Sequence, residues 1–104
     1  MRIVSIHASA ADEAVAAAAW YERVRPGLGG EFEMALQAAL DLLEAQVVPL
    51  ASMPGECGDR GLKRLVLRRF PFDVIVVTQG DDFTVIAFAH HARRPGYWLE
   101  RLRT

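Results

Sequence analysis

The stretch from Phe70 to His91 constrains the fold most, because two runs rich in β-branched and aromatic residues flank the turn Gly80-Asp81-Asp82. This pattern predicts a β-hairpin with arms Asp73–Gln79 and Phe83–His90. Both arms are apolar at odd and even positions, which is typical of strands in the middle of a sheet. We therefore expect the rest of the chain to extend the hairpin sideways, to cover its faces, or to follow it as the polar tail His91–Trp98.

The size of the chain predicts one domain. With 104 residues, of which 52% are hydrophobic, a single domain spanning residues 1–104 buries roughly two thirds of its unfolded surface. The one cysteine, Cys57, has no partner for an internal disulfide, which favours a reducing compartment. No apolar run approaches the roughly 20 residues of a membrane span. We expect a cytoplasmic protein without a signal peptide or membrane anchor.

The charges divide between the two halves of the chain. Residues 1–59 carry three Arg against nine Asp and Glu, and residues 60–104 carry nine Lys and Arg against four acids, so −6 faces +5. One explanation is that the helices carry acidic residues on their solvent-exposed faces, where the charge only keeps the protein soluble. The alternative is a basic sheet surface that meets an anionic partner.

The first part of the chain predicts a strand and a helix. Arg2–His7 alternates loosely and predicts a short strand that ends in a histidine. Ser9 is expected to cap the following helix, and Asp12, three residues later, is expected to form the reciprocal hydrogen bond of a capping box. The alanine-rich run Ala14–Val24 favours helix. Its predicted buried stripe consists of Ala17, Trp20 or Tyr21, and Val24.

A second, amphipathic helix follows the breaker Arg25–Gly30. We expect it to begin near Glu31 and to end around Val48, because the residue before Pro49 is disfavoured in helical geometry. The short glycine loop between the helices predicts an antiparallel pair. The apolar positions that recur at three and four residues are Phe32, Leu36, Ala39, Leu40, Leu43 and Val47.

The remaining segments complete an α+β order of β-α-α-β-β-β. Pro49–Gly61 has no period and is expected to be loop. Leu62–Arg69 predicts an outer strand, with Leu65 and Leu67 on one face and charges on the other. The amphipathic helices must bury their apolar stripes on one face of a mainly antiparallel sheet.

Several segments, in this order, carry a family resemblance: Trp20-Tyr21-Glu22, Arg25–Gly29, Leu67–Phe72, and Ala87–His91 with Arg93–Trp98. With them the chain resembles the RelE/ParE superfamily of type II toxin-antitoxin toxins, in its ParE-like, plasmid-stabilisation branch. The resemblance implies a toxin that causes growth arrest and is held inactive, in a toxin-antitoxin hetero-oligomer, by an antitoxin encoded beside it. The target would be DNA gyrase, as in ParE toxins, or ribosome-associated mRNA, as in RelE toxins.

The sequence departs from the RelE pattern on the strand Val74–Gln79, which carries no arginine. RNA cleavage needs a base for the 2′-hydroxyl, a cation for the phosphorane and an acid for the leaving oxygen. We therefore favour a non-enzymatic, ParE-like toxin. Two alternatives stay open: an mRNA interferase, and a non-toxic fold that only binds an antitoxin. The candidate catalytic residues for an interferase are Arg68, Arg69, His90, His91 and Tyr97.

Three histidines allow several interpretations. His7, His90 and His91 lack a nearby carboxylate or thiolate in sequence, so they make a thin ligand set, and we expect no metal and no cofactor. A histidine that ends a strand and hydrogen-bonds a backbone carbonyl or Tyr97 would be structural. Acid-base work by His90 or His91 together with Arg68 is the alternative.

Arginines and aromatic residues form the predicted binding surface for antitoxin and target. Guanidinium groups on two strands could converge into one patch that binds phosphate or carboxylate, or could simply be solvated. One ring of the first helix should pack on the sheet and the other should face elsewhere as an antitoxin anchor, and the C-terminal rings should either cover the core or face the target. The arginine patch would also include Arg69. The residues of this predicted surface are Trp20, Tyr21, Arg64, Arg68, Arg93, Arg94, Tyr97 and Trp98.

Overall fold

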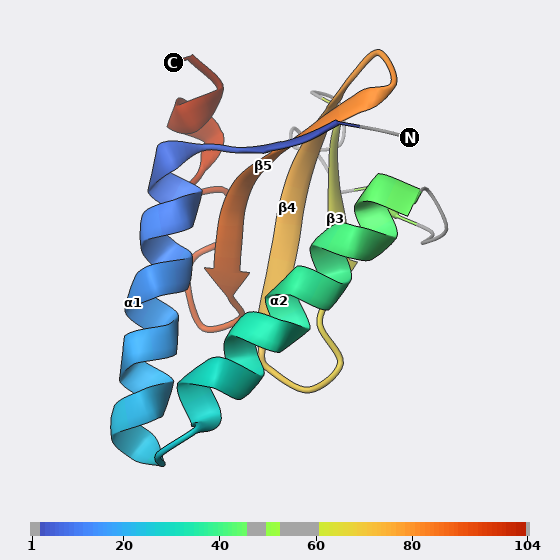
Figure 1. Cartoon of the computed structure of the whole chain (residues 1–104). Helices are drawn as coiled ribbons and strands as arrows, with labels where there is room; N and C mark the ends of the chain where they lie inside the picture. The colour runs from blue at the N-terminus through green and yellow to red at the C-terminus, as the bar shows by residue number, and fades with distance from the viewer. Residues whose placement is uncertain (1–2, 46–49, 53–60, 104) are drawn as a thin grey trace.

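The computed structural model describes residues 3–45, 50–52 and 61–103 and has two helices in front of a mixed sheet (Figure 1). The order β-α-α followed by strands confirms the predicted α+β fold. A 3₁₀ turn, η1, comes last. The elements are β1 (Val4–Ile6), α1 (Ala8–Val24), α2 (Leu28–Ala45), β2 (Ala51–Ser52), β3 (Leu62–Val66), β4 (Phe72–Gln79), β5 (Asp82–His90) and η1 (Leu99–Arg103).

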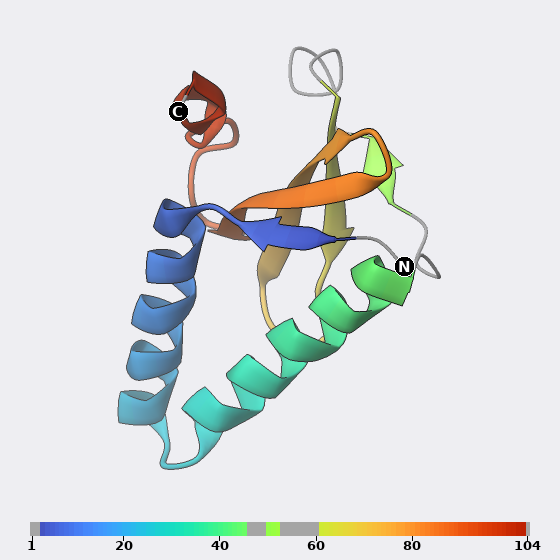
Figure 2. The same ribbon diagram turned by 45° about the horizontal axis from the view of Figure 1, so that its top comes forward.

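The predicted hairpin forms the centre of the sheet, whose strand order is β1-β5-β4-β3-β2. β1 runs parallel to β5, and the other neighbours are antiparallel, so the sheet is mainly antiparallel as expected. Figure 2 shows β1 beside β5 and the two helices diverging from their connection. Gln79 pairs with Asp82, so the turn has the two residues Gly80 and Asp81, and Gly80 takes the positive φ of 62° that such a turn requires.

An irregularity in the hairpin places two consecutive side chains of β5 on the same face. Ile75 pairs with Ala87, whereas its neighbour Val76 pairs with Val85, which leaves Ile86 as an extra residue. The extra residue shifts the alternation of side chains along β5. Ile86 and Ala87 consequently both belong to the cluster on the face away from the helices.

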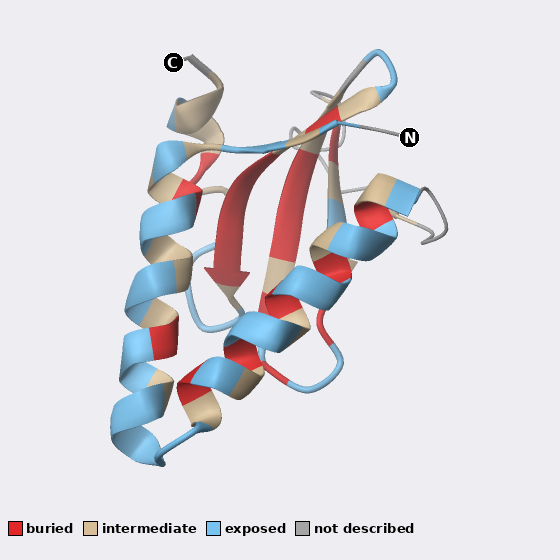
Figure 3. Cartoon of the chain, viewed as in Figure 1, coloured by how far each residue is buried: buried red, intermediate tan, exposed pale blue. Residues whose placement is uncertain are grey.

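Both helices bury their apolar stripes against one face of the sheet (Figure 3). The centre of this core is aromatic: Phe32 from α2 meets Phe70 and Phe72 with ring centroids 5.2 and 5.0 Å apart, and Tyr21 from α1 meets Phe70 at 5.0 Å. Such tilted and edge-to-face pairs add about 0.5–1.5 kcal/mol each beyond area burial. Tyr21 is therefore the ring that packs on the sheet, and Trp20 is 54% exposed.

The C-terminal segment covers the opposite face of the sheet. Trp98, only 4% exposed, packs with Leu62, Ile75 and Ile86. Burial of an aromatic side chain of roughly 200 Å² is worth about 5 kcal/mol. The indole N–H of Trp98 has no hydrogen-bond acceptor among the described residues. The predicted covering role of the tail is thus confirmed for Trp98.

The helices begin at other residues than the sequence predicts. The N-cap of α1 is His7, whose Nδ1 accepts a hydrogen bond from the Ser9 N–H at 3.1 Å, so the predicted Ser9 cap is wrong. Because the helix begins at Ala8, neither acid lies in its first turn. Val24 is 57% exposed and does not belong to the buried stripe. In α2 the predicted apolar face is confirmed for Phe32, Leu36, Ala39, Leu40 and Leu43, but the helix starts at Leu28 rather than near Glu31.

The segment between α2 and β3 also differs from the prediction where the structure describes it. β2 pairs with β3, so Pro49–Gly61 is not wholly loop and β3 is not the outermost strand. β3 ends at Val66 because the chain then turns into Phe70–Phe72. Val47, Val48, Pro49 and Cys57 lie outside the described residues. Of the helices in the described ranges, none has the length and apolarity needed to cross a membrane.

Candidate functional site

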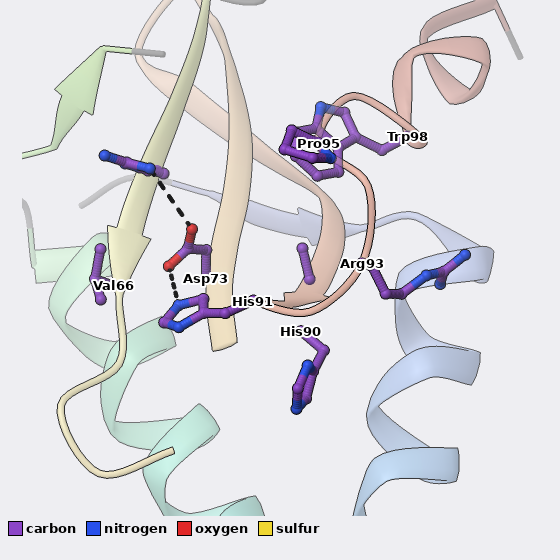
Figure 4. Close-up of a pocket in the computed structure, with 9 residues that line it drawn as sticks. Val66, Asp73, His90, His91, Arg93, Pro95 and Trp98 are labelled. Atoms are coloured by element: carbon purple, nitrogen blue, oxygen red, sulfur yellow. Dashed lines mark hydrogen bonds and ion pairs between the residues drawn. The ribbon is translucent and has the colours of Figure 1, made fainter. Parts of the chain in front are cut away.

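A hollow of about 340 Å³ lies where β3, β4 and β5 meet the loop after β5 (Figure 4). The strand register builds its base, because Val66 pairs with Asp73 and Asp73 pairs with Ala89. We call it the strand-end hollow. It is lined by Arg64, Val66, Asp73, Ala89, His90, His91, Arg93, Pro95 and Trp98.

Asp73 organises the polar side of the strand-end hollow. Its carboxylate accepts a hydrogen bond from His91 Nε2 at 2.8 Å, and its other oxygen lies 3.9 Å from an Arg64 guanidinium nitrogen. The carboxylate can only accept, so the His91 proton is held on Nε2 and Nδ1 is the basic nitrogen of the neutral ring. An imidazole oriented in this way can act as a general base.

His90 lies on the other side of the sheet from Asp73. Its ring packs edge-on against Phe72 with centroids 5.0 Å apart, and Figure 4 shows it pointing away from His91. Its Nδ1 accepts from the Ala92 N–H at 2.9 Å. The ring closes a second hollow of about 200 Å³, which we call the apolar socket. The socket is lined by Ala17, Trp20, Tyr21, Phe72 and His90.

Tyr97 and two arginines converge on Glu13 of α1. The Glu13 carboxylate accepts hydrogen bonds from the Tyr97 hydroxyl, from Arg101 at 2.9 and 3.1 Å, and from Arg93 at 3.2 Å. Burial, and then the hydrogen bond and charge of Glu13, raise the pKa of Tyr97 above its usual range. The hydrogen bond to Glu13 also raises the pKa of Arg101. We call these four residues the Glu13 cluster.

The Glu13 cluster also closes the edge of β5 beyond the end of β1. Glu13 accepts the Phe88 N–H at 3.1 Å, and Arg101 donates to the Ile86 carbonyl at 2.8 Å. These are backbone groups next to the irregularity in β5, and side chains satisfy them. The cluster thus ties the C-terminal segment to both α1 and the sheet.

The arginines do not converge as one patch. Arg64 and Arg93 both line the strand-end hollow, although Arg93 extends toward α1 (Figure 4). Arg69 donates to Glu31 of α2 and thereby lowers the pKa of that carboxyl. Arg68 and Arg94 are exposed, and neither lines the strand-end hollow.

Sequence reasoning did not find Glu13 or Asp73. The prediction that no carboxylate lies near the histidines is wrong, because Asp73 bonds His91. The structural interpretation holds for His7 and His90, but each ring accepts from a backbone N–H instead of bonding a carbonyl. Among the residues that the structure describes, no three His, Cys, Asp or Glu side chains lie close enough to hold a metal ion.

A groove runs between the two helices. It has a volume of about 630 Å³ and is lined by Ala14, Val15, Ala18, Ala19, Glu22, Gly29, Gly30 and Glu33. Gly29 allows the close approach of the helices, since a Cβ at this position would lie 2.5 Å from the Ala18 carbonyl oxygen. Its N–H donates to Glu22 at 3.1 Å. We call this surface, with its apolar floor and acidic edges, the helix groove.

Comparison with known proteins supports the fold. No model of a known protein family matches the chain, and no curated protein does. Among solved structures, it is similar to a chain described as "Chromosomal ParDE TA system from P. aeruginosa", with a TM-score of 0.70 and 19% sequence identity. The alignment covers 86% of this chain and 96% of that chain. At this identity the similarity shows a common fold, two helices on a mixed sheet.

Proposed function

We propose that this chain is the toxin of a type II toxin-antitoxin system, of the ParE-like kind, and that an antitoxin encoded beside it neutralises it. The observation that carries the proposal is the fold similarity to a ParDE toxin-antitoxin structure over most of both chains. The resemblance of residues Trp20–Glu22, Arg25–Gly29, Leu67–Phe72, Ala87–His91 and Arg93–Trp98 to ParE-like toxins points the same way. The protein would be a single cytoplasmic domain, 1–104.

The helix groove supports a role in binding another protein. Its floor is made of small apolar side chains and Val15 beside it is 71% exposed, which suits the apolar face of a partner segment. Trp20, 54% exposed, adds an aromatic anchor on α1. The antitoxin would lie along this helix pair and continue toward the sheet edge.

The proposed mechanism is inhibition of DNA gyrase by protein-protein contact. From Val74 to Thr78, the side chains of β4 are apolar except for the hydroxyl group of Thr78, so this part of the strand carries no acid, base or cation for catalysis. Arg69 is engaged with Glu31 and Tyr97 with Glu13, so two of the candidate catalytic residues have structural partners. This arrangement favours binding over RNA cleavage.

Induced expression tests the proposal. We expect growth arrest, rescue by co-expression of the neighbouring reading frame, and inhibition of gyrase in a supercoiling assay with purified protein. Growth arrest with normal gyrase activity would reject the gyrase target. Expression without growth arrest, combined with a tight complex with the neighbouring product, would identify a non-toxic antitoxin-binding protein.

The His91–Asp73 pair favours a second candidate, a ribosome-associated mRNA interferase. The oriented imidazole could serve as a base and Arg64 could stabilise phosphorane charge in the same hollow. In this case purified protein would cleave mRNA on ribosomes, and His91→Ala would abolish cleavage. Intact mRNA after incubation with wild-type protein would reject the interferase.

A further inference from the structure

We propose that the apolar socket and the loop His91–Pro95 form one docking site for a short acidic segment of the partner protein, with a bulky apolar side chain in the socket and carboxylates on the loop. This inference rests on the proposed function for the identity of the partner, the antitoxin. It deepens that function by specifying the chemistry of the segment that binds.

The socket has the features of an anchor site for one side chain. Its walls are the methyl group of Ala17 and the rings of Trp20, Tyr21 and Phe72, and His90 closes it at the sheet. Trp20 packs edge-to-face against Tyr21 with ring centroids 5.1 Å apart, so the core supports one side of the exposed indole. An exposed aromatic side chain that a partner can bury is typical of an interface hot spot.

The loop beside the socket supplies the charge that selects the partner. His90 ends β5 and lines the socket, and the loop that follows carries two exposed arginines, Arg93 and Arg94. Figure 1 shows this loop between the end of β5 and α1. Arg93 is held by Glu13 and lies over the Tyr97 ring, with its guanidinium carbon 3.7 Å from the centroid, yet its side chain remains 54% exposed.

Arg94 adds an exposed positive charge at this site. Among the residues that the structure describes, Arg94 makes no ion pair, in contrast to Arg93. An exposed guanidinium can pair with a carboxylate on a partner. The adjoining acids, Glu13 and Asp73, are engaged with Arg101 and His91. The site therefore favours an acidic segment over a basic one.

The first test measures the antitoxin, purified as the product of the neighbouring reading frame, against variants of this chain. We expect Trp20→Ala to weaken binding about 30-fold through faster dissociation. We expect Arg94→Glu to slow association about 10-fold at low salt, with the difference shrinking as salt rises. Arg94 is exposed and pairs with no acid among the described residues, so Arg94→Glu should leave the fold intact even if Trp20→Ala alters folding.

Two matched controls separate the docking site from general surface effects. Met34→Ala removes an apolar side chain that is 74% exposed on α2, and Lys63→Glu reverses a positive charge on β3, outside the docking site. Each should change affinity less than about twofold. Equal effects of Trp20→Ala and Met34→Ala, or of Arg94→Glu and Lys63→Glu, would overturn the inference while leaving an antitoxin complex intact.

The second test does not need the antitoxin. A random peptide library displayed on phage and selected on the wild-type chain, with counter-selection on the Trp20→Ala, Arg94→Glu double variant, should yield peptides with one bulky apolar residue flanked by Asp or Glu. Selected peptides that are basic, or that bind the double variant equally, would overturn the docking site. A neighbouring product that does not bind at all would instead reject the proposed function.

Discussion

The Glu13 cluster makes a quantitative prediction for stability. The substitution Glu13→Gln keeps the size of the side chain but removes the negative charge of the carboxylate that accepts hydrogen bonds from Arg101, Arg93 and Tyr97. The Gln side chain keeps one acceptor oxygen, but its NH₂ group is a donor and cannot accept a hydrogen bond from these groups. We expect Arg101 to be left as a poorly compensated cation, which makes the folded state less stable.

The magnitude follows from the burial of the pair. The side chains of Glu13 and Arg101 are 14% and 16% exposed. Breaking a fully buried pair costs about 3–5 kcal/mol. The remaining exposure and the retained acceptor oxygen reduce the expected loss in free energy of unfolding to about 3 kcal/mol. The total free energy of unfolding of a chain of this size is roughly 5–15 kcal/mol. A loss of this magnitude should therefore lower the melting temperature by roughly 15 °C.

Urea unfolding followed by circular dichroism and tryptophan fluorescence provides the measurement. Glu33→Gln, on an exposed part of α2, is the matched control and should change the free energy of unfolding by less than about 0.5 kcal/mol. Tyr97→Phe removes one hydrogen bond of the cluster and should cost about 1–2 kcal/mol. A loss below about 1 kcal/mol for Glu13→Gln would refute the idea that the cluster secures the C-terminal segment.

Three further predictions concern pH and helix packing. The raised pKa of Tyr97 means that its stabilising contribution is complete below the unfolded value of about 10 and is lost above it, so melting temperatures between pH 9 and 11.5 should fall more steeply in wild type than in Tyr97→Phe. Gly29→Ala should destabilise the fold by about 1–2 kcal/mol, because the new Cβ meets a carbonyl oxygen of α1. Gly30→Ala should stabilise the fold by about 0.5–1 kcal/mol, because its Cβ meets open space. Urea titrations of the two variants should show these opposite changes in the free energy of unfolding. The hydrogen bond from Arg69 lowers the pKa of Glu31, so stability from this pair is present above the ordinary carboxyl pKa and is lost as pH falls through the lowered one; NMR titration should show the Glu31 pKa rising in Arg69→Ala.

Local patterns in the sequence predicted both helices and the strands β1, β3, β4 and β5 in their order, but not β2. The period of the apolar residues in α2 placed Phe32, Leu36, Ala39 and Leu43 in the core, since a helix repeats its face every three to four residues. Apolar side chains on both faces of the hairpin placed β4 and β5 inside the sheet, between β1 and β3. These features depend on neighbours a few residues apart, so they can be derived without the fold.

Only the tertiary structure decided the composition of the candidate sites. Glu13 meets Arg101 across 88 residues of sequence, and Asp73 meets His91 across 18. The extra residue Ile86 changes which side chains of β5 face the helices, and the pattern of apolar residues in the sequence does not reveal this change. The packing of elements that are distant in the sequence decides which carboxylate pairs with which cation. The composition of the chain does not predict these pairs. The sequence alone therefore determined which segments form the fold, whereas packing determined which charges are paired and which remain available to a partner.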